Sequence, residues 1–203
     1  MFINVFVLVI FMCWFSNRLK DYLSEKEEFQ EASEIVCANG RGNIWLIGGS
    51  VYRSLAHLLY DVEEPDVDFD FIVEGMNGEL ILPCGWDLKT NSYGNPKFVS
   101  NGSSIDFVLL DTVESIKRRG LDFTFDNFLT GTPLTIQSIG YNVLTGKIEG
   151  EIGIYAIRNR IVGINDLTQT IICSRKQRLS VENFVKIKAR SLDFDSALEF
   201  EMV

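Results

Sequence analysis

The chain has 203 residues, 46% of them hydrophobic, and a formal net charge of -9 at pH 7. Such a composition supplies a core for one domain of ordinary size and excludes a chain that is disordered throughout. The acidic balance argues against extensive contact with a long nucleic acid, because basic residues that neutralise phosphates supply much of that binding.

Histidine and cysteine usage narrows the chemistry further. The single histidine, His57, excludes a metal site built from several histidines. The four cysteines are scattered, without the paired spacing of a zinc site, and indicate reduced thiols in a cytoplasmic protein. Any catalysis must therefore depend mainly on carboxylates.

Residues 1–16 contain no charged side chain. A helix that spans a bilayer needs ~20 apolar residues, and a signal peptide carries positive charge ahead of its apolar stretch. We therefore expect this segment to be a helix buried against the domain. Membrane contact through residues 1–16, which would anchor the protein, is the alternative.

The first half of the chain shows helix and strand signals around a glycine pair. Apolar residues at helical spacing predict an amphipathic helix over 17–36, followed by a loop over 38–43. A short strand is expected at 44–47, and a second helix is expected after the turn Gly48-Gly49-Ser50. Strand, glycine turn and helix form the clearest local pattern in the sequence.

The remaining elements are shorter. Residues 61–65 form an acidic loop, and the segment 66–73, which opens with alternating polar and apolar residues, is predicted to be a strand. We further expect strands at 104–110, 136–139 and 147–149, helical turns at 111–119, and a helix over 180–198 that is capped by Ser180. The segment 171–179 fits more than one type of element.

The alternating aspartates are the strongest functional signal. Asp66, Asp68 and Asp70 share one face of their strand, and Asp106 lies within the other predicted strand. Clustered carboxylates repel each other unless a hard divalent cation such as Mg²⁺ or Mn²⁺ lies between them. Asp68 with Asp70, or Asp66 with Asp68, could form the metal pair. A solvated strand face would give the same alternation without any metal.

The glycine turn adds a second signal. Gly48, Gly49 and Ser50 allow backbone amides at a helix N-terminus to approach phosphate groups closely. A triphosphate bound there, with its metal on the neighbouring aspartates, would form a coherent nucleotide site.

Four motifs, in order, resemble one known family. The stretch IWLIGGSVYRSLAHLL, followed by PDVDFDFIVEG, resembles the head domain of class II tRNA nucleotidyltransferases and bacterial poly(A) polymerases. These belong to the DNA polymerase β-like nucleotidyltransferase superfamily. The segments NSYGNPKF with SIDFVLLD, RRGLDFTFDNFL and YNVLTGKIEGEIGIYAIRNRIVGI continue the resemblance, which covers roughly 43–164.

The resemblance implies both fold and organisation. We expect an α+β nucleotidyltransferase fold with a mixed, mostly antiparallel sheet, helices on one face, and additional N- and C-terminal helices. Residues 43–165 would form the head domain. Residues 1–42 would precede it as the apolar segment and amphipathic helix, and 166–203 would follow as a short, neck-like helical extension.

It also implies an activity. The chain would be a template-independent transferase that moves a nucleotide from a nucleoside triphosphate to a hydroxyl acceptor, most readily an RNA or tRNA 3′ end, and releases pyrophosphate. The family's spacing from the metal pair to a glycine, here Gly75, favours Asp68 and Asp70 over Asp66 and Asp68. Catalysis and metal binding would then involve Asp68, Asp70 and Asp106, with Mg²⁺ or Mn²⁺ as the cofactor. Nucleotide binding would involve Gly48, Gly49, Ser50, Arg53, Arg119 and Asp122. The oligomeric state is open.

Several positions depart from the family pattern, among them Asp126-Asn127, where asparagine-alanine is expected. Tyr52 and Arg53 stand where the family has arginine and aspartate, and Asp111 stands where arginine is usual. The alternatives are therefore a non-catalytic nucleotide-binding or regulatory module of the same fold, or a nucleotidyltransferase that acts on a protein or small molecule.

Overall fold

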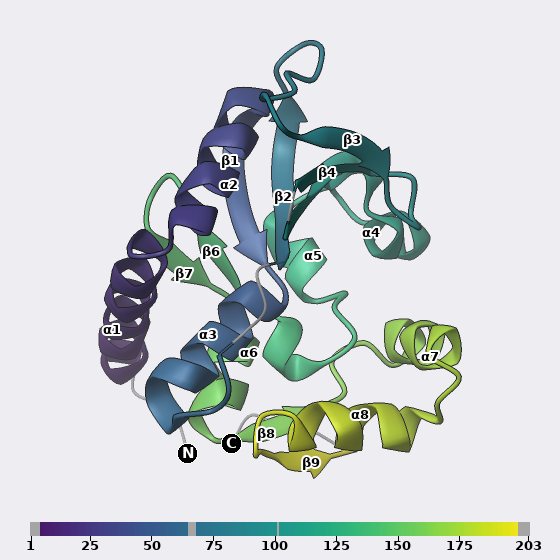
Figure 1. Cartoon of the computed structure of the whole chain (residues 1–203). Coiled ribbons are helices and arrows are strands. Elements are labelled where there is room, and N and C mark those ends of the chain that lie inside the picture. The colour runs from purple at the N-terminus through teal and green to yellow at the C-terminus, as the bar shows by residue number, and fades with distance from the viewer. Residues whose placement is uncertain (1–4, 65–67, 101, 199–203) are drawn as a thin grey trace.

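The computed structural model describes residues 5–64, 68–100 and 102–198. A mixed sheet lies at its centre (Figure 1), with strand order β3-β4-β5-β2-β1-β6-β7. Only the β2–β5 pair of this sheet is parallel, and the other neighbours are antiparallel. The strands are β1 Gly40–Ile47, β2 Asp68–Met76, β3 Asp87–Thr90, β4 Pro96–Ser100, β5 Ser103–Leu109, β6 Gly140–Asn142 and β7 Lys147–Glu149.

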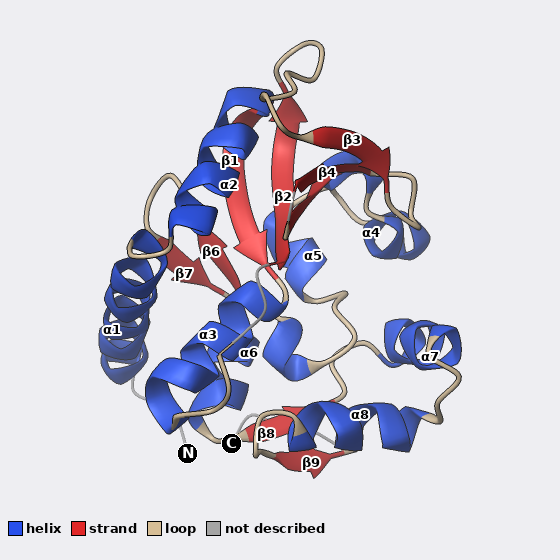
Figure 2. Cartoon of the chain, in the orientation of Figure 1, coloured by secondary structure: helices blue, strands red, loops and turns tan. Residues whose placement is uncertain are grey.

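Alternation along the central strands gives the sheet two faces, each of which packs against helices. Leu46, Phe71 and Phe107 point into the main core, which is covered by helices α1 Val5–Ser24, α2 Glu27–Asn39 and α3 Gly49–Tyr60. Trp45 and Ile72 point to the opposite face, where the short helices α4 Glu114–Arg119 and α5 Phe125–Leu129 pack. Figure 2 shows these helices around the sheet. Asp70 and Asp106, which alternate with the core residues Phe71 and Phe107, therefore point to the second face of the sheet.

The C-terminal part packs beside the end of α3. Helix α6 Glu151–Arg158 contacts α3, and strand β8 Ile161–Gly163 pairs in parallel with β9 Asp195–Ala197. Helices α7 Leu167–Lys176 and α8 Val181–Arg190 lie between these two strands in sequence. The predicted α+β class, with a mixed and mostly antiparallel sheet, is confirmed.

The predicted helix over 17–36 is wrong as a single element. It is divided between α1 and α2, with a break after Ser24. Leu19 and Leu23 are buried, but a continuous helix would carry the polar residues at 26 and 27 onto the same face. The break avoids that burial and lets Phe29 start a new apolar face. The predicted loop at 38–43 is also wrong, since α2 continues to Asn39 and β1 begins at Gly40.

Two later expectations need correction. A 3₁₀ turn, Thr135–Gln137, replaces the strand predicted over 136–139; Ile136 and Ile139 are both fully buried, and their spacing of three suits such a turn. The helix predicted over 180–198 ends at Arg190 because Leu192 and Phe194 return to the core. The predicted Ser180 cap is present, and its Oγ accepts from the amide of Asn183 at 3.2 Å.

The N-terminal segment packs into the domain where it is described. Phe15 and Ser16 are buried, and Ser16 Oγ accepts a hydrogen bond from the amide of Ile148 on β7 at 2.9 Å. Among the described residues, no helix combines the length and apolarity needed to cross a bilayer. Asp66, the alternative metal ligand, lies outside the described residues.

Candidate active site

Three charged side chains form a row across the second face of the sheet. Parallel pairing of β2 and β5 sets Asp70 directly opposite Asp106. Antiparallel pairing of β4 and β5 sets Lys97 opposite Asp106 on its other side. The row Asp70, Asp106, Lys97 therefore follows from strand register alone.

Both oxygens of the Asp106 carboxylate have hydrogen-bond donors. Asn91 Nδ2 donates to Oδ1 at 2.7 Å, and Lys97 Nζ donates to Oδ2 at 3.0 Å. The side chains of the ion pair are 30% exposed for Lys97 and 17% exposed for Asp106. This partial burial screens the pair less than a surface salt bridge would be screened.

Asp70 has a perturbed acidity. Burial raises the pKa of Asp70 to about 6, and the neighbouring charge of Asp106 adds to the rise. Lys97 opposes this change in pKa, while Asp68 contributes a smaller increase. A bound cation would relieve the same repulsion between carboxylates.

Asp68 begins strand β2 at the edge of this group. Its carboxylate Oδ1 accepts a hydrogen bond from Ser104 Oγ at 2.7 Å, and its backbone carbonyl accepts one from Ser50 Oγ. The Ser50 hydroxyl therefore ties the start of α3 to the start of β2. It is buried in that role.

Gly48 brings the start of α3 against Asp70. Its φ of 71° lies in the region that favours glycine, and a Cβ there would lie 2.7 Å from Asp70 Oδ2. Helix α3 begins at the next residue, so the backbone amides of its first turn lie beside the carboxylate row. The glycine turn predicted as a phosphate cradle and the predicted aspartates are thus neighbours.

A pocket of about 560 Å³ lies over this row. Gly48, Asp70, Asp106 and Lys97 line one wall, and Phe128 and Gln169 contribute to the remainder. This pocket has room for a nucleotide-sized ligand. It joins the start of α3, the carboxylate row, helix α5 and helix α7.

Of the six predicted nucleotide-binding residues, only Gly48 lines this pocket; Gly49, Ser50, Arg53, Arg119 and Asp122 lie outside its lining. Arg53 is half-buried on α3, one turn after Gly49, and Asp122 is exposed ahead of α5. Arg119 donates from Nε to the Ser115 carbonyl at 2.9 Å and from Nη1 to Thr130 Oγ1 at 2.9 Å. The Arg119 guanidinium therefore joins α4 to the end of α5.

The residues that depart from the family pattern also lie away from the carboxylates. Tyr52 is 3% exposed, and Lys188 Nζ of α8 lies 6.0 Å from the centre of its ring. Asp111 is exposed in the turn after β5. Neither side chain lines the pocket.

Sequence analysis missed Asn91 and Lys97, although a signal for Lys97 was present. The dipeptide Asn-Gly at 101–102 is typical of a two-residue hairpin turn. A hairpin centred there pairs residue 97 with residue 106, as the structure shows. Asn91 carries no comparable signal, because its position depends on the β3–β4 connection.

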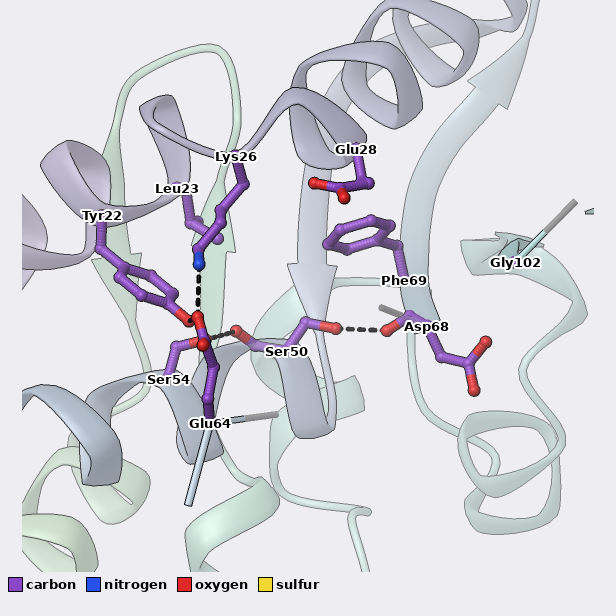
Figure 3. A pocket seen from close by; sticks show the side chains of 10 residues that line it. All are labelled: Tyr22, Leu23, Lys26, Glu28, Ser50, Ser54, Glu64, Asp68, Phe69 and Gly102. Carbon is purple, nitrogen blue, oxygen red and sulfur yellow. Dashed lines mark hydrogen bonds and ion pairs between the residues drawn. The ribbon is translucent and has the colours of Figure 1, made fainter. Parts of the chain in front are cut away.

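A second cavity, of about 550 Å³, lies beside the α1–α2 connection (Figure 3). Its polar groups pair with each other: Lys26 with Glu64, and Tyr22 Oη with Glu64 Oε1 at 2.7 Å. In Figure 3 the Asp68 carboxylate points away from this cluster. The cluster therefore holds the chain ahead of β2, whereas Asp68 lines this cavity and not the pocket over Asp70 and Asp106.

The residues of the row fit a hard cation in their chemistry. Asp70 and Asp106 offer carboxylate oxygens on directly opposite positions, and magnesium and manganese prefer such ligands. In the arrangement described for these residues, however, no three acidic, histidine or cysteine side chains converge as metal ligands. A cation at this place would share the Asp106 carboxylate with the donors Asn91 and Lys97.

The sheet order, the aspartates on neighbouring parallel strands and the glycine-initiated helix define the nucleotidyltransferase fold. The CCA-adding enzyme of Bacillus stearothermophilus in complex with CTP shares this fold with a TM-score of 0.57 and 21% identity, over 85% of this chain and 41% of that one. A tRNA nucleotidyltransferase complexed with a primer tRNA and an incoming ATP analog has a TM-score of 0.52 and 18% identity, over 83% and 46% of the two chains. A tRNA-processing enzyme with CTP has a TM-score of 0.52 and 16% identity, over 83% and 42%.

This chain therefore spans less than half the length of each of these structures. No family model and no curated protein sequence matches it.

Proposed function

We propose that the chain is a metal-dependent nucleotidyltransferase. It transfers a nucleotide from a nucleoside triphosphate to a hydroxyl acceptor and releases pyrophosphate. The observation that carries this proposal is the opposed pair Asp70 and Asp106, which lies beside the start of a glycine-initiated helix in one pocket.

Each part of the site has a role in this reaction. The amides at the start of α3 bind the β- and γ-phosphates, and Gly48 and Gly49 let those phosphates approach the backbone. Asp68, Asp70 and Asp106 would hold Mg²⁺ or Mn²⁺. The bound metal would lower the pKa of the acceptor hydroxyl and neutralise charge on the leaving pyrophosphate. Asp106 faces the pocket and assists in removing the proton of the acceptor.

An RNA 3′ end is the acceptor that the surroundings favour. Four exposed cations, Lys117 and Arg118 on α4 and Arg175 and Lys176 on α7, lie on the two helices beside the pocket. Arg118 Nη2 donates to Gln169 Oε1 at 3.0 Å and so joins these helices. Local positive charge in an acidic chain suits the phosphates of an acceptor strand. The solved structure with a primer tRNA is consistent with the same class of acceptor.

The test is pyrophosphate release from each of the four ribonucleoside triphosphates with Mg²⁺, with total RNA as the acceptor. We expect release with the wild-type chain and its loss in Asp70→Asn. Asp87→Asn, an exposed aspartate on β3, is the matched control and should retain release.

The outcomes separate the alternatives. Pyrophosphate release that needs a protein or small-molecule fraction and no RNA would identify the acceptor as a protein or a small molecule. Binding of a triphosphate with no release under any condition would identify a non-catalytic nucleotide-binding module instead. Equal release by the wild type and Asp70→Asn would contradict the proposed site.

A further inference from the structure

Lys97 places a positive charge inside the proposed cation site. Its Nζ lies 3.0 Å from Asp106 Oδ2, and its backbone position is directly opposite Asp106 in the β4–β5 register. Only 30% of the Lys97 side chain is exposed, so the ion pair is held within the wall of the pocket. Lys97 also acts on Asp70 electrostatically across the row.

A divalent cation bound to Asp106 would be repelled by the positive charge of Lys97. Asn91 is neutral and occupies Oδ1, so it competes with a metal only as a hydrogen-bond donor. Lys97 occupies Oδ2 as a cation, so it also repels a second positive charge within a few ångströms. Of the two partners of Asp106, Lys97 is therefore the one whose charge opposes a bound cation.

We propose that Lys97 competes with the divalent cation for the Asp106 carboxylate and so sets the affinity of the site for metal. The inference rests on the proposed function, because it concerns the same carboxylates. When the metal binds, the Lys97 ammonium leaves Asp106 and remains at the wall of the pocket, where it can meet the phosphates of the nucleotide. Lys97 is thus a residue that determines affinity and is not itself a metal ligand.

The experiment measures Mn²⁺ binding to the whole chain by the loss of the free-ion electron paramagnetic resonance signal, without nucleotide. Removal of one charge-assisted competitor in Lys97→Met should tighten Mn²⁺ binding by about tenfold. Lys97→Arg should stay close to the wild type because the positive charge is kept. Lys97→Gln provides a second neutral variant, and thermal unfolding of each variant confirms that it is folded.

The chain offers a matched control in Lys89. This exposed lysine lies directly opposite Lys97 in the β3–β4 register, one strand farther from Asp106. Lys89→Met removes the same charge without breaking the ion pair and should leave Mn²⁺ binding nearly unchanged. In an Asp106→Asn background, Lys97→Met should lose its effect, because the group for which lysine and metal compete is gone.

Three results are distinguishable. Tightening that is specific to Lys97 and depends on Asp106 supports the inference. Equal affinities in the wild type, Lys97→Met and Lys97→Gln, or equal tightening in Lys89→Met, would overturn it and leave the proposed transferase standing. Absence of Mn²⁺ binding in every variant would also overturn the inference, because no metal would then compete with Lys97 for Asp106; the transferase itself is tested separately by pyrophosphate release.

Discussion

Asp70 should make stability depend on pH in a direction opposite to that of an ordinary ion-paired carboxylate. Its pKa is about 6 in the fold against an ordinary value of 3.8. Between these values the folded chain keeps a proton that the unfolded chain has lost, so stability falls as pH rises through that window. Above pH 6 without metal, Asp70→Asn should be more stable than the wild type by roughly 2–3 kcal/mol. Urea unfolding at pH 4.5 and 7.5 measures the difference in stability between Asp70→Asn and the wild type. The same difference at both pH values would contradict the prediction.

Magnesium should act on the same group. A cation binds the ionised form of Asp70, so Mg²⁺ should raise the melting temperature of the wild type more at pH 7.5 than at pH 5. The Asp70→Asn variant should lose this pH-dependent stabilisation. Differential scanning calorimetry in calcium-free buffer, with and without MgCl₂ at the two pH values, measures the melting temperature. A magnesium effect of the same size at both pH values would point to ions bound elsewhere.

Gly48 tests the contact between the start of α3 and Asp70. In Gly48→Ala the new Cβ would clash with Asp70 Oδ2, and the alanine would have to keep the positive φ of this position. We therefore expect the free energy of unfolding to fall by about 2–4 kcal/mol and nucleotide binding to weaken. Gly78 has a φ of +64° with open space around its Cβ position. Gly78→Ala therefore measures the strain alone, and chemical unfolding of the two variants separates the clash from it. Equal losses would show that the contact with Asp70 is unimportant.

At the scale of elements, Arg119 holds α4 to α5. Gly131 makes room for it, since a Cβ there would lie 2.3 Å from Arg119 Nη2. Arg119→Met leaves the carbonyls of Ser115 and Asn127 without this donor and should cost roughly 1–3 kcal/mol of stability. Triphosphate affinity should change much less, because the residue lies outside the pocket lining. Lys117→Met, on the exposed side of α4, is the control. A loss of triphosphate affinity without a loss of stability in Arg119→Met would support the predicted role of Arg119 in nucleotide binding.

The elements that the sequence predicted well are those with a strong local period. Alternation at the start of β2, and the apolar run of β5, placed Asp68, Asp70 and Asp106 on strands without reference to the rest of the chain. The errors arose where tertiary contacts decide, as at the break between α1 and α2 and the early end of α8 at Arg190. The partners of Asp106 depend on pairing between strands, so a period within one strand could not reveal Lys97.

At the scale of the whole molecule, the core is continuous from the N-terminal helix to the strands that carry the site. Leu19 on α1 is 0% exposed and belongs to the same buried cluster as Phe71 and Phe107, which flank Asp70 and Asp106 in sequence. Helix α1 also reaches β7 through the hydrogen bond between Ile148 and Ser16. Loss of packing at α1 should therefore reach the site through the shared core.

Leu19→Ala tests that coupling. The cavity left at a fully buried leucine should cost roughly 2–5 kcal/mol, whereas Lys20→Ala on the exposed side of α1 should cost little. Urea unfolding followed by far-ultraviolet circular dichroism and by triphosphate binding should show both signals lost together at a lower urea concentration in Leu19→Ala. If α1 were an independent appendage, its loss would precede the main transition and nucleotide binding would keep the midpoint of the wild type. Coincident transitions would make the N-terminal helix part of the folding unit that holds the carboxylates in register.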